Sequence, residues 1–208
     1  MTASVDAWLA RLERQAPDVV AAWRAMPAMD ERGLSALRSL RRELRTRVGP
    51  GSADEILAQQ EAVGDELGAV LASLPDELLR APGGEEDWNV AQAFAHATAA
   101  RRFLAAWAAL DAAGEWPEHR PPMVRPSVPG PPDASREQLM MLLDKSRRSL
   151  RESAARIAGH ETDRCRLEHP IIGRLRCGEW LLFVGVHDLM HLEQLHRLAS
   201  AASAHAPA

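Results

Sequence analysis

Strand-forming patterns are almost absent from this sequence, and this absence limits the chain to a helical fold. The 208 residues include no tyrosine and three phenylalanines, and nowhere do β-branched and polar residues alternate over the length of a strand. Apolar residues recur instead every three to four positions, the period of an amphipathic helix. The sequence therefore predicts an all-α protein of one domain or of one domain with an extension.

Prolines and glycines divide the helical pattern into segments. The first helical segment covers 3–25 and is broken at Pro17, and the second covers 30–48, from an Asp30 cap to the glycines around Pro50. Four longer helices are expected over 52–74, 88–112, 134–159 and 178–200. Ser52 with Glu55 predicts a capping box at the start of the first of these.

Two of the connections between these helices are irregular. Residues 117–132 hold seven of the chain's fourteen prolines, so we expect an extended crossover there and not a helix. Residues 160–178 are expected to be a loop, with a short hairpin as an alternative. These boundaries predict an up-down-type four-helix bundle over 52–200 with one long crossover loop, two additional helices in an N-terminal extension over 1–50, and a flexible tail over 201–208.

Charge and cysteine content argue against several classes of protein. The net charge of −4 at pH 7 gives no overall cationic field of the kind that nucleic-acid-binding proteins use. Two cysteines cannot build a disulfide framework, and Cys165 and Cys177 are too far apart for a CxxC motif. No apolar run is long enough to span a bilayer, and the N-terminus lacks the apolar region of a signal peptide. We therefore expect a cytoplasmic protein without a membrane partner, for which nucleic acid is a disfavoured partner.

The strongest chemical pattern is the pair His187 and His191 on the last helix. A spacing of four residues points both imidazoles to one face, one turn apart, which suits two ligands of a single metal ion. The pair lies within an apolar stripe made of Trp180, Val184, Leu195 and Leu198. The alternative is two buried histidines that hydrogen-bond to neighbours, but an apolar stripe offers few partners.

His96 interrupts the apolar face of the helix over 88–112 in the same way. If the two helices pack together, three histidines meet in the core of the bundle. Three neutral histidines that leave a coordination position open are typical of a catalytic site for zinc or a similar divalent metal. Such an ion lowers the pKa of a bound water or thiol.

Gln92 and Asp188 are the candidates for a supporting or substrate-orienting role. Gln92 lies one turn before His96 on the same face, and Asp188 follows His187 at about 100° around the helix; for Asp188 an exposed surface carboxylate is an equal alternative. The string HDLMH is also similar to the HExxH of zinc proteases. Its aspartate is one methylene shorter than the glutamate that acts as general base, and no third ligand of the usual kind follows, so a metalloprotease is disfavoured.

Other residues carry weaker signals. Cys177 is expected to be a buried, inert thiol, and a role in the site is the less favoured alternative. Two alternatives stay open for Phe103, Trp107 and Trp180, which could line a pocket or pack in the core. The remaining histidines are expected to be solvated surface residues: His119, His160, His169, His196 and His205.

Several segments together resemble the DinB/YfiT-like metalloenzyme family, also described as DinB-like domains. They are WNVAQAFAH at 88–96, HPIIGRL at 169–175, EWL at 179–181 and HDLMHLEQL at 187–195, preceded by LPDELL at 74–79. The resemblance implies a four-helix bundle in which His96, His187 and His191 bind one divalent metal, often zinc or nickel. It also implies, for members with an assigned activity, transferases or isomerases that use a low-molecular-weight thiol. The helices over 3–48 and the proline-rich loop are not explained by the resemblance.

Three functional hypotheses follow. The first is a metal-dependent enzyme that activates a low-molecular-weight thiol or water for an S-transferase, isomerase or hydrolase reaction on a small-molecule substrate. The second is a metal-binding stress-response protein without catalysis, which would use the same ligands. The third is an interaction module that binds through an arginine stripe, although such a stripe is more often a solvated helix face; it comprises Arg38, Arg41, Arg42 and Arg45. A homodimer is expected by analogy with the family.

Overall fold

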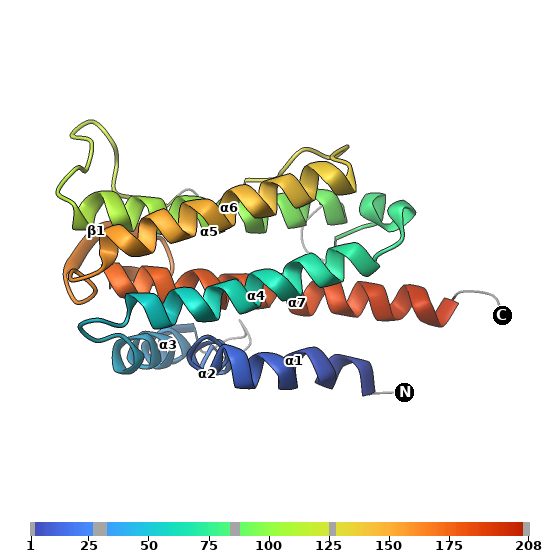
Figure 1. Cartoon of the computed structure of the whole chain (residues 1–208), viewed down its shortest axis with the longest axis horizontal. Coiled ribbons are helices and arrows are strands. Elements are labelled where there is room, and N and C mark those ends of the chain that lie inside the picture. The colour runs from blue at the N-terminus through green and yellow to red at the C-terminus, as the bar shows by residue number, and fades with distance from the viewer. Residues whose placement is uncertain (1–2, 27–32, 84–87, 125–127, 206–208) are drawn as a thin grey trace.

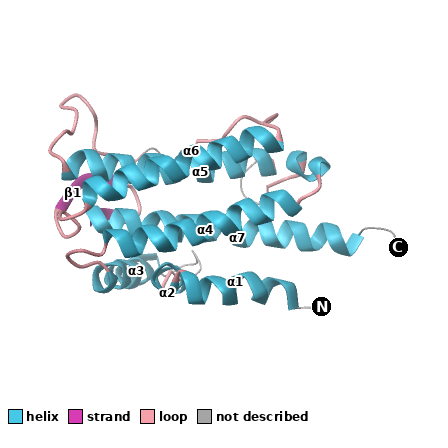
Figure 2. Cartoon of the chain, viewed as in Figure 1, coloured by secondary structure: helices cyan, strands magenta, loops and turns pink. Residues whose placement is uncertain are grey.

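The computed structural model describes residues 3–26, 33–83, 88–124 and 128–205, and most of them are helical (Figure 2). The helices are α1 (Ala3–Gln15), α2 (Pro17–Arg24), α3 (Gly33–Arg47), α4 (Ala53–Ser73), α5 (Val90–Ala112), α6 (Arg136–Ile157) and α7 (Cys177–His205), with a short 3-10 helix, η1, at Asp76–Arg80. Two strands, β1 (Arg164–His169) and β2 (Gly173–Arg176), form an antiparallel hairpin between α6 and α7. The prediction of a mainly helical chain is confirmed, and so is the hairpin alternative for the loop before the last helix.

The N-terminal part contains three helices in the described residues, so the prediction of two is wrong. Pro17 begins a new helix at its first turn, where a missing backbone N–H costs nothing. The Asp30 cap lies outside the described residues. At the other end of the chain α7 continues to His205, five residues past the expected end, into the stretch that was predicted to be a flexible tail.

The capping box predicted at Ser52 is absent. Ser52 has helical dihedral angles (φ −81°, ψ −6°), and its Oγ donates to the carbonyl of Gly49 at 2.7 Å. The buried carboxylate of Glu161 accepts from the N–H of Ala53 in its place, at 3.3 Å. A residue more than a hundred positions away therefore satisfies the first turn of α4.

Helices α4, α5, α6 and α7 pack side by side, with α5 and α4 each in contact with both α6 and α7 (Figure 1). Helices α5 and α6 run in the same direction and are joined by the crossover segment, residues 113–135, of which the structure describes 113–124 and 128–135. Asn89 before α5 donates to the carbonyl of Pro132 before α6 at 2.8 Å, and Glu115 after α5 pairs with Arg156 in the last turn of α6. The starts of the two helices therefore meet at one end and their last turns at the other.

The three N-terminal helices cover one side of this group (Figure 1) and share its core. Helix α2 packs on α7 and α4, and α1 packs on α4. The approach of α2 to α7 is closest at Gly185, where a Cβ would lie 2.7 Å from Val19 Cγ1 and 2.8 Å from Gln60 Nε2. The apolar residues that α1–α3 bury are Trp8, Leu12, Val19, Val20, Leu40 and Leu44.

Candidate metal centre

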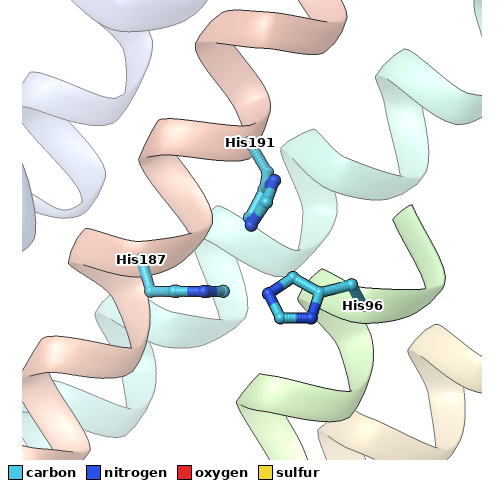
Figure 3. A group of neighbouring side chains, drawn as sticks. All are labelled: His96, His187 and His191. Carbon is cyan, nitrogen blue, oxygen red and sulfur yellow. The ribbon is translucent and has the colours of Figure 1, made fainter. Parts of the chain in front are cut away.

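His96, His187 and His191 meet between α5 and α7 (Figure 3). One ring nitrogen from each histidine lies within 4.8 Å of the other two. The ring centroids of His187 and His191 are 4.7 Å apart, and each is 5.3 Å from the centroid of His96. The structure thus brings together the three residues that the sequence analysis selected.

The local sequence explains why the rings converge. On α7 the spacing of four residues places His187 and His191 one above the other on the face that meets α5. In the sequence, the histidines of α5 and α7 stand next to buried apolar residues, so both helices bury much of the segment that carries the histidines. These residues are Phe94, Ala95 and Ala97 on α5 and Val186, Leu189 and Leu192 on α7.

The ring of His96 is oriented by the crossover segment. Its Nδ1 lies 3.0 Å from the backbone carbonyl oxygen of Val128. Because a carbonyl only accepts, this contact places the ring hydrogen on Nδ1 and leaves the lone pair on Nε2.

Gly130 allows the crossover segment to come this close to α5. A Cβ at Gly130 would lie 2.3 Å from the Cβ of Ala95, and the N–H of Gly130 donates to the carbonyl of Gln92 at 3.3 Å. Only glycine fits against Ala95 at that position, two residues after Val128.

His191 is oriented by Gln194, which the sequence analysis did not select. The Nδ1 of His191 lies 3.4 Å from Gln194 Oε1, and the amide nitrogen of this buried glutamine donates to the carbonyl of Gly83. The N–H···O=C geometry at Gly83 fixes which end of the amide faces the histidine. A glutamine three residues after a candidate ligand is the signal that was available in the sequence.

Burial keeps two of the three imidazoles neutral. It lowers the pKa of His187 well below its ordinary value, and the neighbouring His191 and His96 lower it further. Burial also lowers the pKa of His191 to about 4, with a further contribution from His96 and an opposing one from Gln194. The Nδ1 of His187 is buried without a hydrogen-bond partner among the described residues. Neutral rings with available lone pairs are the form in which histidine binds metals.

The family model of the DinB superfamily matches residues 59–195, which include all three histidines. The chain belongs to the DinB superfamily. Comparisons with curated proteins and with solved structures gave no significant match. Among the described residues of this DinB-superfamily chain, no helix has both the length and the apolar character needed to cross a membrane.

Gln92 has a structural role in this DinB-superfamily chain. Its Oε1 accepts from the N–H of Asn89 at 3.1 Å, while its own N–H donates to the side chain of Asn89 at 2.9 Å. The two residues form the capping box of α5. The structure therefore shows the side chain of Gln92 engaged at the start of the helix.

Asp188 is not an exposed carboxylate. It is fully buried and forms an ion pair with Arg101 of α5, which is also fully buried. Burial raises the pKa of Asp188 to about 6, and Arg101 opposes this rise. Arg101 was missed by the sequence analysis, although its place one turn from both Ala97 and Ala105 on a buried face of α5 was a usable signal.

The other histidines divide into two groups. His119 and His160 are exposed, as predicted, and the side chain of His205 lies outside the described part of the chain. His196 was predicted to be solvated, but its ring stacks on Trp8 at 4.8 Å and its Nε2 lies 3.1 Å from a carboxylate oxygen of Glu66.

His169 is also partly buried, contrary to the prediction. Its ring faces Phe183 at 6.0 Å, and its Nδ1 accepts from the N–H of Ile171 at 3.1 Å. Burial lowers the pKa of His169 below its ordinary value. The hairpin therefore turns this side chain inward against α7.

The cysteines lie at or beside the start of α7, away from the histidine cluster, whereas the ring of Trp88 lies 5.1 Å from that of His96. Cys177 begins α7, ten residues or about 15 Å along the helix from His187. It is buried beside Cys165, whose pKa is raised by a hydrogen bond to Cys177 and by burial. Trp180 is fully buried in the core, as the packing alternative predicts, whereas Phe103 is 47% exposed.

The arginine stripe of α3 is partly engaged within the protein. Arg45 pairs with the buried carboxylate of Glu179, and Arg41 donates to the carbonyl of Arg174 at 3.2 Å. Arg38 and Arg42 are exposed. Two of the four guanidinium groups thus hold α3 against α7 and the hairpin.

Proposed function

We propose that His96, His187 and His191 bind one divalent metal ion, zinc or nickel, and that this DinB-superfamily protein is a metal-dependent enzyme. In this proposal α4–α7 form one four-helix bundle; the up-down order expected from the sequence does not hold between α5 and α6, which the crossover makes parallel. The observation that carries it is the convergence of three imidazole nitrogens within 4.8 Å of one another. The buried Nδ1 of His187, which has no hydrogen-bond partner among the described residues, supports it, because a buried ring nitrogen without a partner is costly unless something binds it.

The donor set fits a catalytic ion. Zinc binds histidine nitrogens tetrahedrally, and three protein ligands leave one position for an exchangeable group. When bound, such an ion is a Lewis acid that lowers the pKa of a thiol or a water. All three side chains are neutral ligands, and the one buried carboxylate nearby, Asp188, is balanced by Arg101. The positive charge of the ion is therefore not compensated by the protein, which favours an anionic partner such as a thiolate.

The residues around the site hold the ligands in place. The carbonyl of Val128 fixes the ring of His96, and Gln194 fixes that of His191. Such outer contacts set the tautomer and orientation of a ligating histidine. We propose an S-transferase or isomerase reaction in which a low-molecular-weight thiol is the cosubstrate and a small electrophile is the substrate, with hydrolysis as the corresponding reaction of water.

Metal content tests the first part of the proposal. Protein purified without a histidine tag is analysed for metals as wild type, as His187→Ala and as His191→Ala, with the exposed His119→Ala as the matched control. We expect close to one zinc or nickel ion per chain in the wild type and in the control, and loss of the ion in both core variants. No metal in the wild type, together with an apo protein that takes up neither ion on titration, would contradict the proposal.

Turnover separates an enzyme from a metal-binding stress-response protein without catalysis. Metal-loaded wild type and His191→Ala are assayed with one electrophile and a panel of low-molecular-weight thiols. An enzyme gives a rate with at least one thiol that the variant loses. Equal rates in the two proteins favour the non-catalytic alternative.

Two further properties stay predictions from the sequence and the family resemblance. These are the cytoplasmic location and the homodimer. Light scattering on the metal-loaded protein measures the second directly, as one or two chains per particle.

A further inference from the structure

We infer that the buried ion pair between Arg101 and Asp188 is a positioning element for the histidine site, which sets the register of α5 against α7. The inference rests on the proposed metal centre and concerns how this chain assembles it. Both residues are fully buried, and Arg101 Nη1 donates to Asp188 Oδ2. They therefore act as positioning residues, which fix the helices that carry the histidines.

The pair joins three helices. Arg101 belongs to α5 and Asp188 to α7, and the second guanidinium nitrogen, Nη2, donates to the backbone carbonyl of Gln60 in α4 at 3.1 Å. The side chain of Gln60 in turn donates to the carbonyl of Leu181 in α7 at 2.8 Å. Arg101 is thus fixed against α7, which packs on α5, and against α4, which packs on α6 and α7.

The pair and the histidines connect the same two helices at nearly the same level. Asp188 directly follows His187, and Arg101 lies five residues, about 7.5 Å, after His96 along α5. A slip of α5 by one helical turn, about 5.4 Å, would separate Arg101 from Asp188 and would also move His96 away from His187 and His191. One register therefore satisfies both contacts.

The chain leaves room for the guanidinium group. A Cβ at Gly64 of α4 would lie 3.1 Å from Arg101 Nη2, closer than an ordinary contact. Glycine in the middle of a helix is unfavourable compared with alanine, so its use at this position is explained by the space that the arginine needs.

A buried ion pair is expected to select the register of two helices more than to increase the stability of the fold. A buried ion pair loses hydration that its attraction only partly restores, and apolar residues of similar size often replace both partners without loss of stability. A misaligned register, however, leaves two charges unpaired in the core and is strongly disfavoured. Buried polar groups are best established in this role, as selectors of one register among several.

The test compares the double variant Arg101→Leu/Asp188→Leu with the wild type and with a matched control, Arg11→Leu/Glu66→Leu. The control removes another ion pair with a buried carboxylate, which joins α1 to α4 and does not involve α5. Glu66 also contacts His196, about two turns beyond Asp188 on α7, so the control includes the loss of one polar contact to α7 as well. Zinc affinity is measured by competition with a chelator, and the unfolding of each metal-free protein is measured in urea. The single variants are left out, because each strands one buried charge and is expected to fold poorly.

We expect the double variant to unfold in one transition near that of the wild type and to bind zinc 10–100-fold more weakly, the range found when groups that orient metal ligands are removed. The control keeps the zinc affinity of the wild type. A stable double variant with unchanged zinc affinity would overturn the inference.

A second readout does not depend on metal. Spin labels are attached to cysteines introduced at two exposed positions, Phe103→Cys on α5 and Arg197→Cys on α7, and the native cysteines are buried. We expect one narrow distance distribution with the pair present and a shifted or broadened one in the double variant. An unchanged distribution would overturn the inference even if zinc affinity fell. A wild type that binds no zinc would refute the proposed function alone, because the label distances still decide the register.

Discussion

The Nδ1 of His96 lies 3.0 Å from the backbone carbonyl oxygen of Val128, so a loop between two helices orients a half-buried ring that faces His187 and His191. Val128 is in the second half of the crossover segment, which passes over α5 where Gly130 contacts Ala95. The crossover is therefore part of the candidate site as well as a connection between α5 and α6.

We predict that Gly130→Ala weakens zinc binding about 10-fold. The new Cβ would lie 2.3 Å from the Cβ of Ala95, so the crossover has to move away from α5 and the carbonyl of Val128 leaves His96. Val128→Ala is the matched control, because it keeps the carbonyl and changes only an exposed side chain. Chelator competition measures both variants, and equal affinities for Gly130→Ala and wild type would refute the orienting role of this contact.

The second prediction concerns the pH dependence of the metal-free protein. The pKa of His191 is about 4 in the folded chain against an ordinary value of 6.5, so below pH 6.5 the unfolded chain binds a proton that the folded chain does not. The contribution of the neutral His191 to the free energy of unfolding is therefore complete above pH 6.5 and is lost as the pH falls towards 4. Between pH 7.5 and pH 5 this contribution is about 2 kcal/mol.

Comparison with His191→Gln isolates that contribution. Burial raises the pKa of Asp188 to about 6, which changes stability in the opposite direction over this range and is common to both proteins. Urea midpoints at several pH values should show the stability difference between wild type and variant shrink by about 2 kcal/mol on acidification. A difference that stays constant with pH would show that His191 titrates normally.

The third prediction concerns the packing of α2 on α7. Gly185→Ala is expected to reduce the free energy of unfolding by about 1–3 kcal/mol, because its Cβ would lie 2.7 Å from Val19 and 2.8 Å from the amide of Gln60. Gly68→Ala in α4 is the control. Its Cβ would meet Leu143 at an ordinary 3.5 Å, so the better helix propensity of alanine should stabilise the protein by up to about 1 kcal/mol. Urea unfolding measures both variants, and the prediction is confirmed if Gly185→Ala lowers the free energy of unfolding while Gly68→Ala raises it. If both substitutions raise it, the prediction is contradicted.

The fourth prediction is that the N-terminal helices unfold together with the rest of the chain. Leu12 of α1 is fully buried in the common core, and Leu12→Ala should cost about 2–5 kcal/mol. Circular dichroism and tryptophan fluorescence should report one shared transition in wild type and variant. The exposed Gln15→Ala should leave it unchanged. An early, separate transition of α1–α3 would show that they form an independent unit.

Sequence periodicity was sufficient to locate the helices and the three histidines. The four-residue spacing of His187 and His191, inside an apolar stripe, limits where their rings can point. The start of the helix expected over 88–112 and the hairpin before α7 were also visible as local patterns. These features depend on residues that are close in sequence, so short-range rules describe them well.

The features that were missed depend on contacts between distant segments. Arg101 meets Asp188 only when α5 and α7 are packed, and His196 is covered by Trp8 from the other end of the chain. Ser52 was misread because its own backbone is already helical, so its side chain cannot reach the first turn. A helical pattern tells which face of a helix is buried, but not which residue of another helix it meets.

The contact between His96 and Val128 has a consequence for the evolution of such a protein. A backbone carbonyl is present whatever residue occupies position 128, so substitutions there leave the histidine oriented while they alter the surface beside it. Val128 is 59% exposed, and a new side chain at that position meets solvent rather than the core. Mutations in the crossover can thus remodel the approach to the histidines without disturbing the helices that carry them, and new specificities become accessible by steps that each preserve folding.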